Sequence, residues 1–275
     1  MKKSFAEQVI LTSGIFLTVS GSLFPFLWFV LTSLKTQLEV ESIPPIFWPT
    51  VNFAFYRSAL VDHHLSSYLF NSLIVAGSTT MISIFLALPA AYALVRFALR
   101  GKELILGGLL TISMFPPLVI AGPVWQILEG INGLNTLWGL ILPYVSLTLP
   151  LAIWILATFF KDLPVELEEA ARIDGCTTRQ TLVTIMIPLA SPGIFTAAIL
   201  TFIYAWNEFF FALLILTDPM RQTLPVGIAL FQGEFTMPWG EIAAASVLAT
   251  LPLILLVLLF QRGIISGLSA GAVKG

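Results

Sequence analysis

KDLPVELEEAARIDGCTTRQTLVTIMIP, residues 161–188, is a polar stretch in an otherwise apolar chain. Eight of its 28 residues are charged, compared with 10% of the whole chain. Pro164 suits a first helical turn, and Gly175 suits the left-handed residue that ends a helix. Thr177 or Thr178 can then cap a second helix. We therefore expect a helix–turn–helix that is exposed to water.

The rest of the chain is too apolar for a soluble globule. Of its 275 residues, 57% are hydrophobic, and the mean hydropathy is +0.95. Soluble domains carry roughly 25% charged residues, so an ordinary cytosolic enzyme is excluded and a lipid bilayer is the expected solvent. The net charge of −2 lacks the basic excess that nucleic-acid binding needs. The single cysteine, Cys176, excludes an intrachain disulfide and a multi-cysteine metal site.

Six segments are long and apolar enough to cross a membrane, which takes roughly 20 residues in a helix. We therefore predict an all-α membrane protein with six transmembrane helices and no attached soluble domain. The first segment follows Lys2 and Lys3, as a signal peptide would, but its apolar stretch is too long and no Ala-x-Ala site closes it. We expect it to be retained. The predicted spans are about 9–34, 68–95, 104–128, 137–160, 189–216 and 242–261.

Basic residues predict the orientation, because they resist translocation across the membrane. With the N-terminus inside, ten lysines and arginines lie on the cytoplasmic side and three lie outside. Both termini are then cytoplasmic, and residues 161–188 form the longest cytoplasmic loop. The ten are Lys2, Lys3, Arg96, Arg100, Lys102, Lys161, Arg172, Arg179, Arg262 and Lys274, and the three are Lys35, Arg57 and Arg221.

The cytoplasmic loop resembles a known motif. Glu169-Ala170-Ala171, then Gly175, then Ile185-x-Ile187-Pro188 follow the spacing of the EAA motif, which marks the membrane subunits of bacterial ABC importers. The usual ending is Ile-x-Leu-Pro, so Ile187 is a conservative departure. Further segments extend the similarity over essentially the whole chain and narrow it to the MalG type of sugar permease. They are residues 114–117 (MFPP), 138–143 (WGLILP), 205–209 (AWNEF), 223–227 (TLPVG) and 267–275 (GLSAGAVKG).

The resemblance implies a type I ABC importer permease fold in a bacterial plasma (inner) membrane, with this chain forming half of the translocation pore. A homologous second permease would complete a heterodimer, and two copies of a cytoplasmic ABC ATPase would bind below. An extracytoplasmic solute-binding protein would deliver a sugar or sugar-like compatible solute. The sequence contains no G-x-x-x-x-G-K-[ST] phosphate loop. We therefore expect no cofactor on this chain, and ATP and Mg in the partner ATPase subunits.

By the same resemblance, the first helix of the loop would sit in a cleft of one ATPase. Closure of the ATPase pair would then switch the permeases from inward-facing to outward-facing. The tail, residues 266–275, would reach between the two ATPases. The residues that the resemblance assigns to ATPase coupling are Glu168, Glu169, Ala170, Ala171, Arg172, Asp174, Gly175, Ile185 and Pro188.

Polar residues within the predicted spans are candidates for the substrate path. A carboxylate such as Glu208 costs at least a few kcal/mol in the bilayer unless it is paired, hydrated or protonated, so it should face the helix bundle. It can contact substrate or gate the path, or it can form a helix-to-helix hydrogen bond that fixes packing. The same alternatives hold for Asn71. The candidate path residues are Asn71, Trp206, Asn207, Glu208 and Phe210.

The sequence supports two other functions less well. A self-sufficient ion-coupled secondary transporter often shows inverted repeats and several buried charges, whereas only Glu208 is clearly mid-span and no repeat is evident. An intramembrane enzyme is disfavoured because there is no H-E-x-x-H motif, and the adjacent His63 and His64 cannot easily converge on one metal. We therefore expect a transport subunit with no catalytic or metal site.

Overall fold

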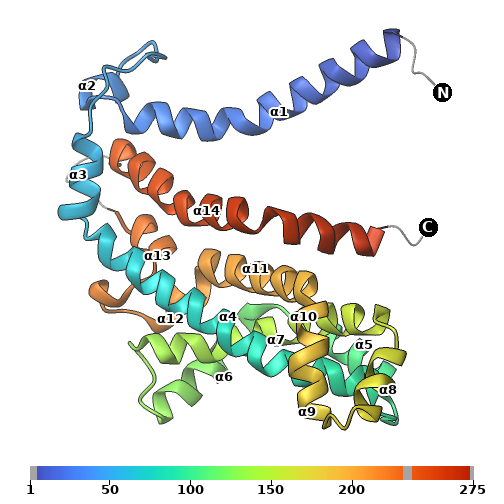
Figure 1. The fold of residues 1–275 in the computed structure, drawn as a ribbon. Coiled ribbons are helices and arrows are strands. Elements are labelled where there is room, and N and C mark those ends of the chain that lie inside the picture. The colour runs from blue at the N-terminus through green and yellow to red at the C-terminus, as the bar shows by residue number, and fades with distance from the viewer. Residues whose placement is uncertain (1–4, 232–236, 273–275) are drawn as a thin grey trace. The chain divides into compact units, whose positions relative to one another are not determined.

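The computed structural model describes residues 5–231 and 237–272. These residues form helices and turns without a strand (Figure 1), which confirms the predicted all-α class. The elements in chain order are α1 (Phe5–Ser33), α2 (Gln37–Val40), α3 (Ala54–Val61), α4 (Leu65–Arg96), α5 (Lys102–Ser113), α6 (Pro117–Gly130), α7 (Leu137–Asp162), α8 (Glu166–Ile173), α9 (Thr178–Thr181), the π-helix η1 (Leu182–Met186), α10 (Ile187–Leu189), α11 (Ser191–Asn207), α12 (Phe210–Ile215), the 3-10 helix η2 (Pro219–Arg221), α13 (Leu224–Ala229) and α14 (Trp239–Ala272).

The chain divides into two compact units, residues 1–66 with 228–252 and residues 67–227 with 253–275. In the first unit, side-chain contacts fix the turn that follows α1. The hydroxyls of Ser33 and Tyr56 are hydrogen-bonded at 2.8 Å, so the end of α1 is tied to α3. Lys35 Nζ lies 4.4 Å from the centre of the Trp28 ring. The chain therefore leaves the first apolar helix along a defined path.

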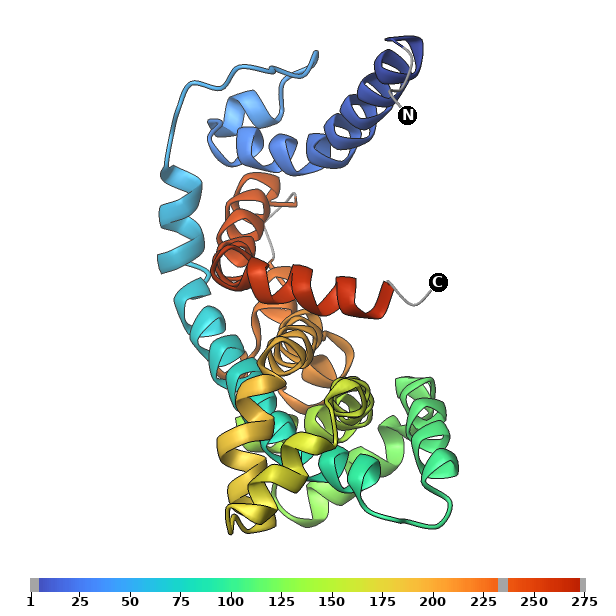
Figure 2. The same ribbon diagram turned by 45° about the vertical axis from the view of Figure 1, so that its right-hand side comes forward.

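The helix α7 is the main packing element of the second unit. It packs against α5, α11 and α12 (Figures 1 and 2). Its buried residues Leu156 and Phe160 share an apolar cluster with Met186 from the polar loop 161–188. Gly193 lets α11 approach closely, because a Cβ there would lie 2.3 Å from Cγ of Phe159. The loop 161–188 and the fifth predicted span are thus both positioned by α7.

Among residues 5–231 and 237–272, four helices are long and apolar enough to cross a membrane. They are α1 over Leu11–Ser33, α4, α7, and α14 over Trp239–Phe260. These match the first, second, fourth and sixth predicted spans. The third predicted span falls on the bent pair Lys102–Ser113 and Pro117–Gly130. The fifth, 189–216, overlaps the second half of the other bent pair, Thr178–Leu189 and Ser191–Asn207, and counting each pair as one span gives up to six.

The third predicted span, 104–128, is not one straight helix. Its two halves, α5 and α6, meet at an angle of 90°. Pro116 is extended, with ψ 123°, and Pro117 is the first residue of α6. A proline disfavours helical geometry in the residue before it but is well tolerated in a first turn. The consecutive prolines therefore end one helix and begin the next.

The fifth predicted span, 189–216, is also divided. The helix α11 ends at Asn207, Glu208 is extended with ψ 129°, and α12 begins at Phe210. A second bend, of 78°, separates Thr178–Leu189 from Ser191–Asn207. The chain thus turns sharply where the polar loop joins α11, and it breaks again at the acidic residue.

The predicted C-terminal tail, residues 266–275, is helical over most of its length. The helix α14 continues to Ala272. Residues 273–275 lie outside the described part of the chain. The tail therefore begins as a continuation of the last apolar helix.

Candidate functional site

The loop 161–188 folds as short helices around a left-handed glycine. Acidic residues occupy the first turn of α8 and Arg172 its last turn, which suits the helix dipole. Gly175 has φ +82° and follows the end of α8. Of the two predicted caps, Thr177 is the one used: its Oγ1 accepts a hydrogen bond from Gln180 N at 3.3 Å. The predicted helix–turn–helix is therefore present.

One face of α8 is fixed to the body of the second unit. Only Glu168 and Ala171, three residues apart, are buried among the residues of this helix. The Tyr92 hydroxyl donates to Glu168 Oε2 at 2.8 Å, and Arg96 Nε donates to Oε1 in an ion pair. Arg96 Nη2 also donates to the Leu163 carbonyl at 2.8 Å. Both carboxylate oxygens of Glu168 are thus bound by the end of α4.

The opposite face of α8 and the following turn are exposed. Ile173 is 87% exposed and adds a large apolar side chain to this face, although the sequence motif does not include it. The exposed members of the predicted coupling set are Glu169, Ala170, Arg172, Asp174, Gly175 and Pro188, whereas Ile185 is half-buried. The predicted set therefore separates into a buried pair that holds the helix and an exposed group that is available to a partner.

Sequence reasoning missed the two residues that hold Glu168. Tyr92 and Arg96 are four apart at the end of α4, so they share one face of that helix. Arg96 entered the prediction only as a charge that sets orientation. The spacing of an aromatic hydroxyl and a guanidinium was visible, but the acid that they bind lies 72 residues further along the chain.

The second candidate site is the break between α11 and α12. The carboxylate of Glu208 accepts from Phe211 N at 3.0 Å (Oε1) and from Ala212 N at 3.3 Å (Oε2). The Tyr144 hydroxyl of α7 donates to Oε2. These backbone donors belong to the first turn of α12, where no intrahelical acceptor is available. The Glu208 side chain therefore caps the first turn of α12 and links α12 to α7.

The other candidate path residues make local or packing contacts. Asn71 is buried, and its Nδ2 donates to the carbonyls of Met220 (3.1 Å) and Gln222 (3.0 Å). Trp206 is buried and stacks on Phe202. The remaining two lie beside Glu208: the Asn207 amide is exposed and donates to its own turn, at Ile203, and Phe210 is half-buried against Phe211. The structure thus places Asn71 in a separate hydrogen-bonded cluster from the break at Glu208.

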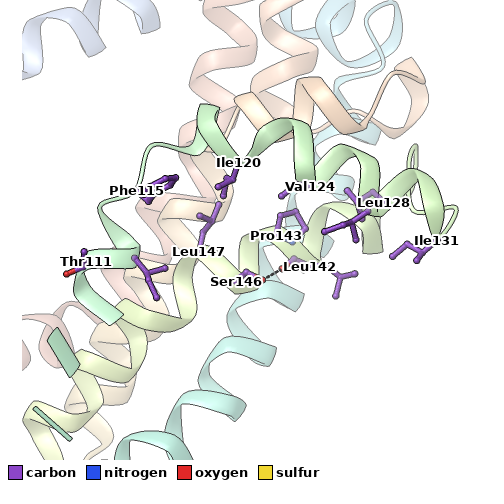
Figure 3. Close-up of a pocket in the computed structure, with 12 residues that line it drawn as sticks. Thr111, Phe115, Ile120, Val124, Leu128, Ile131, Leu142, Pro143, Ser146 and Leu147 are labelled. Atoms are coloured by element: carbon purple, nitrogen blue, oxygen red, sulfur yellow. Dashed lines mark hydrogen bonds between the residues drawn. The ribbon is translucent and has the colours of Figure 1, made fainter. Parts of the chain in front are cut away.

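A cavity of about 410 Å³ lies between the bent pair α5 and α6 and the helix α7 (Figure 3). Its lining is mainly apolar, with Phe115, Val124 and Leu142 among its walls. Its two hydroxyls, from Thr111 and Ser146, donate to carbonyls of their own helices. This lining suits hydrocarbon rather than a polyhydroxylated molecule. In the described residues, no group of three His, Cys, Asp or Glu side chains is placed to hold a metal.

Known proteins match nearly the whole chain. The trehalose/maltose transport system permease protein MalG of Thermococcus litoralis is 41% identical over 100% of both chains. The sulfoquinovosyl glycerol transport system permease protein SmoH of Agrobacterium fabrum is 44% identical, covering 94% of this chain and 91% of that one. The trehalose transport system permease protein SugB of Mycobacterium tuberculosis is 42% identical, covering 94% and 95%. These relatives are transport subunits and not enzymes.

The fold is also known. A chain in the crystal structure of a bacterial ABC transporter involved in the import of the acidic polysaccharide alginate superposes with a TM-score of 0.81 at 21% identity, covering 95% of this chain and 99% of that chain. Residues 79–269 match the family described as binding-protein-dependent transport system inner membrane component. The predicted resemblance to sugar permeases is confirmed, as is the multi-pass inner-membrane location. This chain belongs to the family of inner-membrane components of binding-protein-dependent transport systems.

Proposed function

We propose that this chain forms half of the translocation pore of an ATP-driven importer, and that α8 is where the ATPase acts on it. The exposed face of α8 is the observation that carries this proposal. It presents Ile173 and an acidic group at Glu169 and Asp174, although the opposite face is buried. A short helix with one anchored face and one exposed apolar and acidic face is suited to a groove in a partner protein.

The remaining subunits follow from the family. A second, homologous permease completes the pore as a heterodimer, two copies of a cytoplasmic ATPase bind ATP and Mg, and a solute-binding protein delivers the substrate from outside. The chain crosses the membrane six times with both termini in the cytoplasm; α5 with α6 contributes the third crossing, and α11 with α12 the fifth. ATP binding then alternates the pore between inward-facing and outward-facing states.

The substrate is a sugar or a sugar-like compatible solute. Three relatives are named as permeases for trehalose, trehalose or maltose, and sulfoquinovosyl glycerol, all of which are rich in hydroxyl groups. The path passes the break between α11 and α12, where the exposed amide of Asn207 and the half-buried ring of Phe210 flank Glu208. The buried ring of Trp206 supports this region through packing, whereas Asn71 would contribute to the path from its separate hydrogen-bonded cluster.

A co-purification experiment tests the ATPase contact. Ile173→Asp places a charge on the exposed face of α8 without disturbing a buried side chain, so the chain should insert normally. We expect the ATPase to be lost from the complex purified in mild detergent. Leu38→Asp is the matched control, because Leu38 is 82% exposed but lies in the predicted outer loop. It should retain the ATPase.

Equal ATPase recovery from wild type and Ile173→Asp would show that α8 is not the contact. If no ATPase or second permease accompanies the wild-type chain, the importer assignment fails altogether. A self-sufficient ion-coupled transporter would then be the alternative, with Glu208 as its acidic group. The relatives favour ATP-driven import over this alternative.

A further inference from the structure

The end of α4 contacts the connection between α7 and α8 at two points. Arg96 is the last residue of α4. Its Nε pairs with the Glu168 carboxylate in α8. Its Nη2 donates to the carbonyl of Leu163, the residue that directly follows α7. A single guanidinium thus binds both the coupling helix and the segment that leads into it.

The ion pair is largely shielded from water, and both oxygens of its carboxylate accept hydrogen bonds. The side chains of Arg96 and Glu168 are 10% and 9% exposed. The Tyr92 hydroxyl donates to the carboxylate oxygen of Glu168 that Arg96 Nε does not bind, at 2.8 Å. A shielded charge pair with its remaining acceptor satisfied holds its geometry closely, whereas removal of one partner leaves an uncompensated charge.

Few other contacts attach α8 to the membrane helices. Of its side chains that the structure describes, Glu168 is the one whose hydrogen bonds reach another helix, and Ala171 is the one apolar side chain that is buried. The covalent connection to α7 runs through Leu163, which is extended with ψ 134°, and Pro164. A short extended connection would let an eight-residue helix rotate. The ion pair removes that freedom.

We propose that Arg96, with Tyr92, is a positioning residue that joins α8 rigidly to α4, so that a displacement of α8 is passed directly to the second membrane helix. This proposal rests on α8 being the ATPase contact. Coupling between distant sites requires a physical element that both sites bias. Here that element is α4 together with α8, joined by the Tyr92–Arg96–Glu168 cluster. The apolar core around α7 provides a second, separate connection.

A distance measurement between α4 and α8 tests the rigid joint. Spin labels are placed at Phe85→Cys, which is 76% exposed on α4, and at Glu166→Cys, which is exposed on α8, in a Cys176→Ser background. The complete transporter is measured without nucleotide and after trapping with ATP and vanadate. In the background protein, we expect one narrow distance distribution that is the same in both states, although the complex changes conformation.

Breaking the ion pair should uncouple the two helices. In Glu168→Gln and in Arg96→Gln, we expect the distribution to broaden or to shift by about 2 Å or more on trapping, a displacement typical of helix shifts. The exchanged pair Arg96→Glu with Glu168→Arg should restore the narrow distribution. Glu169→Gln is the matched control without nucleotide, because it neutralises the adjacent carboxylate on the exposed face of α8.

Two results would overturn the proposal. The first is that Glu168→Gln and Arg96→Gln give the same distance distribution as the background protein, both without nucleotide and after trapping. The second is that the distribution of the background protein itself shifts on trapping. If a charge variant fails to fold, Tyr92→Phe removes only one hydroxyl and should still broaden the distribution. If the ATPase is absent from the background complex, the proposed function is refuted instead. The width of the distance distribution without nucleotide then tests the rigid connection between α4 and α8 by itself.

Discussion

At the scale of single residues, Gly175 is required for its backbone conformation. Its φ is +82°, and no atom lies within 4 Å of the position that a Cβ would occupy. Space is therefore available for a side chain, but β-branched residues are strained in this region by about 1–3 kcal/mol. We predict that Gly175→Val distorts the turn between α8 and α9 and lowers the amount of ATPase that co-purifies.

Asparagine separates conformation from contact at this position, because it tolerates the left-handed region better than other side chains. Gly175→Asn should retain much of the ATPase that Gly175→Val loses. If both variants lose it equally, the ATPase itself approaches Gly175 too closely for any side chain, and the conformational explanation is wrong.

Glu39 gives the first unit a dependence on pH. The Thr36 backbone amide donates to its carboxylate at 2.8 Å, and Thr50 N donates at 3.0 Å. These hydrogen bonds lower the pKa of Glu39 from 4.5 to about 2, and the one from the Thr36 backbone has the largest effect. Because the folded pKa lies below the unfolded one, the stabilisation is complete above pH 4.5 and is lost as the pH falls towards 2.

We therefore predict that the amides of Thr36 and Thr50 exchange with solvent faster as the pH is lowered from 4.5 to 2, after correction for intrinsic exchange. Glu39→Gln should remove this dependence, since it cannot titrate. A corrected exchange rate in wild type that stays constant over the same range would contradict the assignment.

At the scale of elements, the break between α11 and α12 is maintained by a side chain. Glu208 accepts hydrogen bonds from the first turn of α12 and from Tyr144 of α7. Loss of a helix cap costs about 0.5–2 kcal/mol. We predict that Glu208→Ala lowers the free energy of unfolding in detergent by about this amount, whereas Asn207→Ala, whose amide bonds only within its own helix, changes it little.

A further substitution, Glu208→Gln, distinguishes a packing role from a role in transport. If Glu208→Gln keeps the stability of wild type but abolishes uptake, the carboxylate acts on the substrate path as well as on the fold. A Glu208→Ala variant as stable as wild type would show that the cap is not what holds the break.

These elements show which features the sequence predicts and which it does not. Apolar segments of about 20 residues located all the long helices, and Pro116-Pro117 explains the bend in the third span. No proline or glycine in the sequence marks the break at Glu208. A carboxylate that accepts hydrogen bonds from the first turn of α12 stabilises the break instead. The Arg96–Glu168 pair joins residues 72 apart, so no local pattern reveals it. The loop motif identified most of the exposed residues but not Ile173, and only tertiary structure assigns Glu168 and Ala171 to the interior.

At the scale of the whole molecule, the orientation in the membrane decides whether the loop can meet an ATPase. Cys176 is the only cysteine in the sequence, and it is partly exposed directly after Gly175. If the loop is cytoplasmic, a membrane-impermeant maleimide should label Cys176 in inside-out vesicles and not in intact cells. Bound ATPase should slow the reaction, because the cysteine adjoins the exposed face of α8.

A cysteine at Leu38 in a Cys176→Ser background provides the opposite reference. Leu38 is 82% exposed in the predicted outer loop, so the reagent should reach it in intact cells. Labelling of Cys176 from outside would invert the topology and place α8 where no ATP is available. Such a result would remove the physical basis for the ATPase contact and for coupling through α4 together, because both require the loop to face the nucleotide.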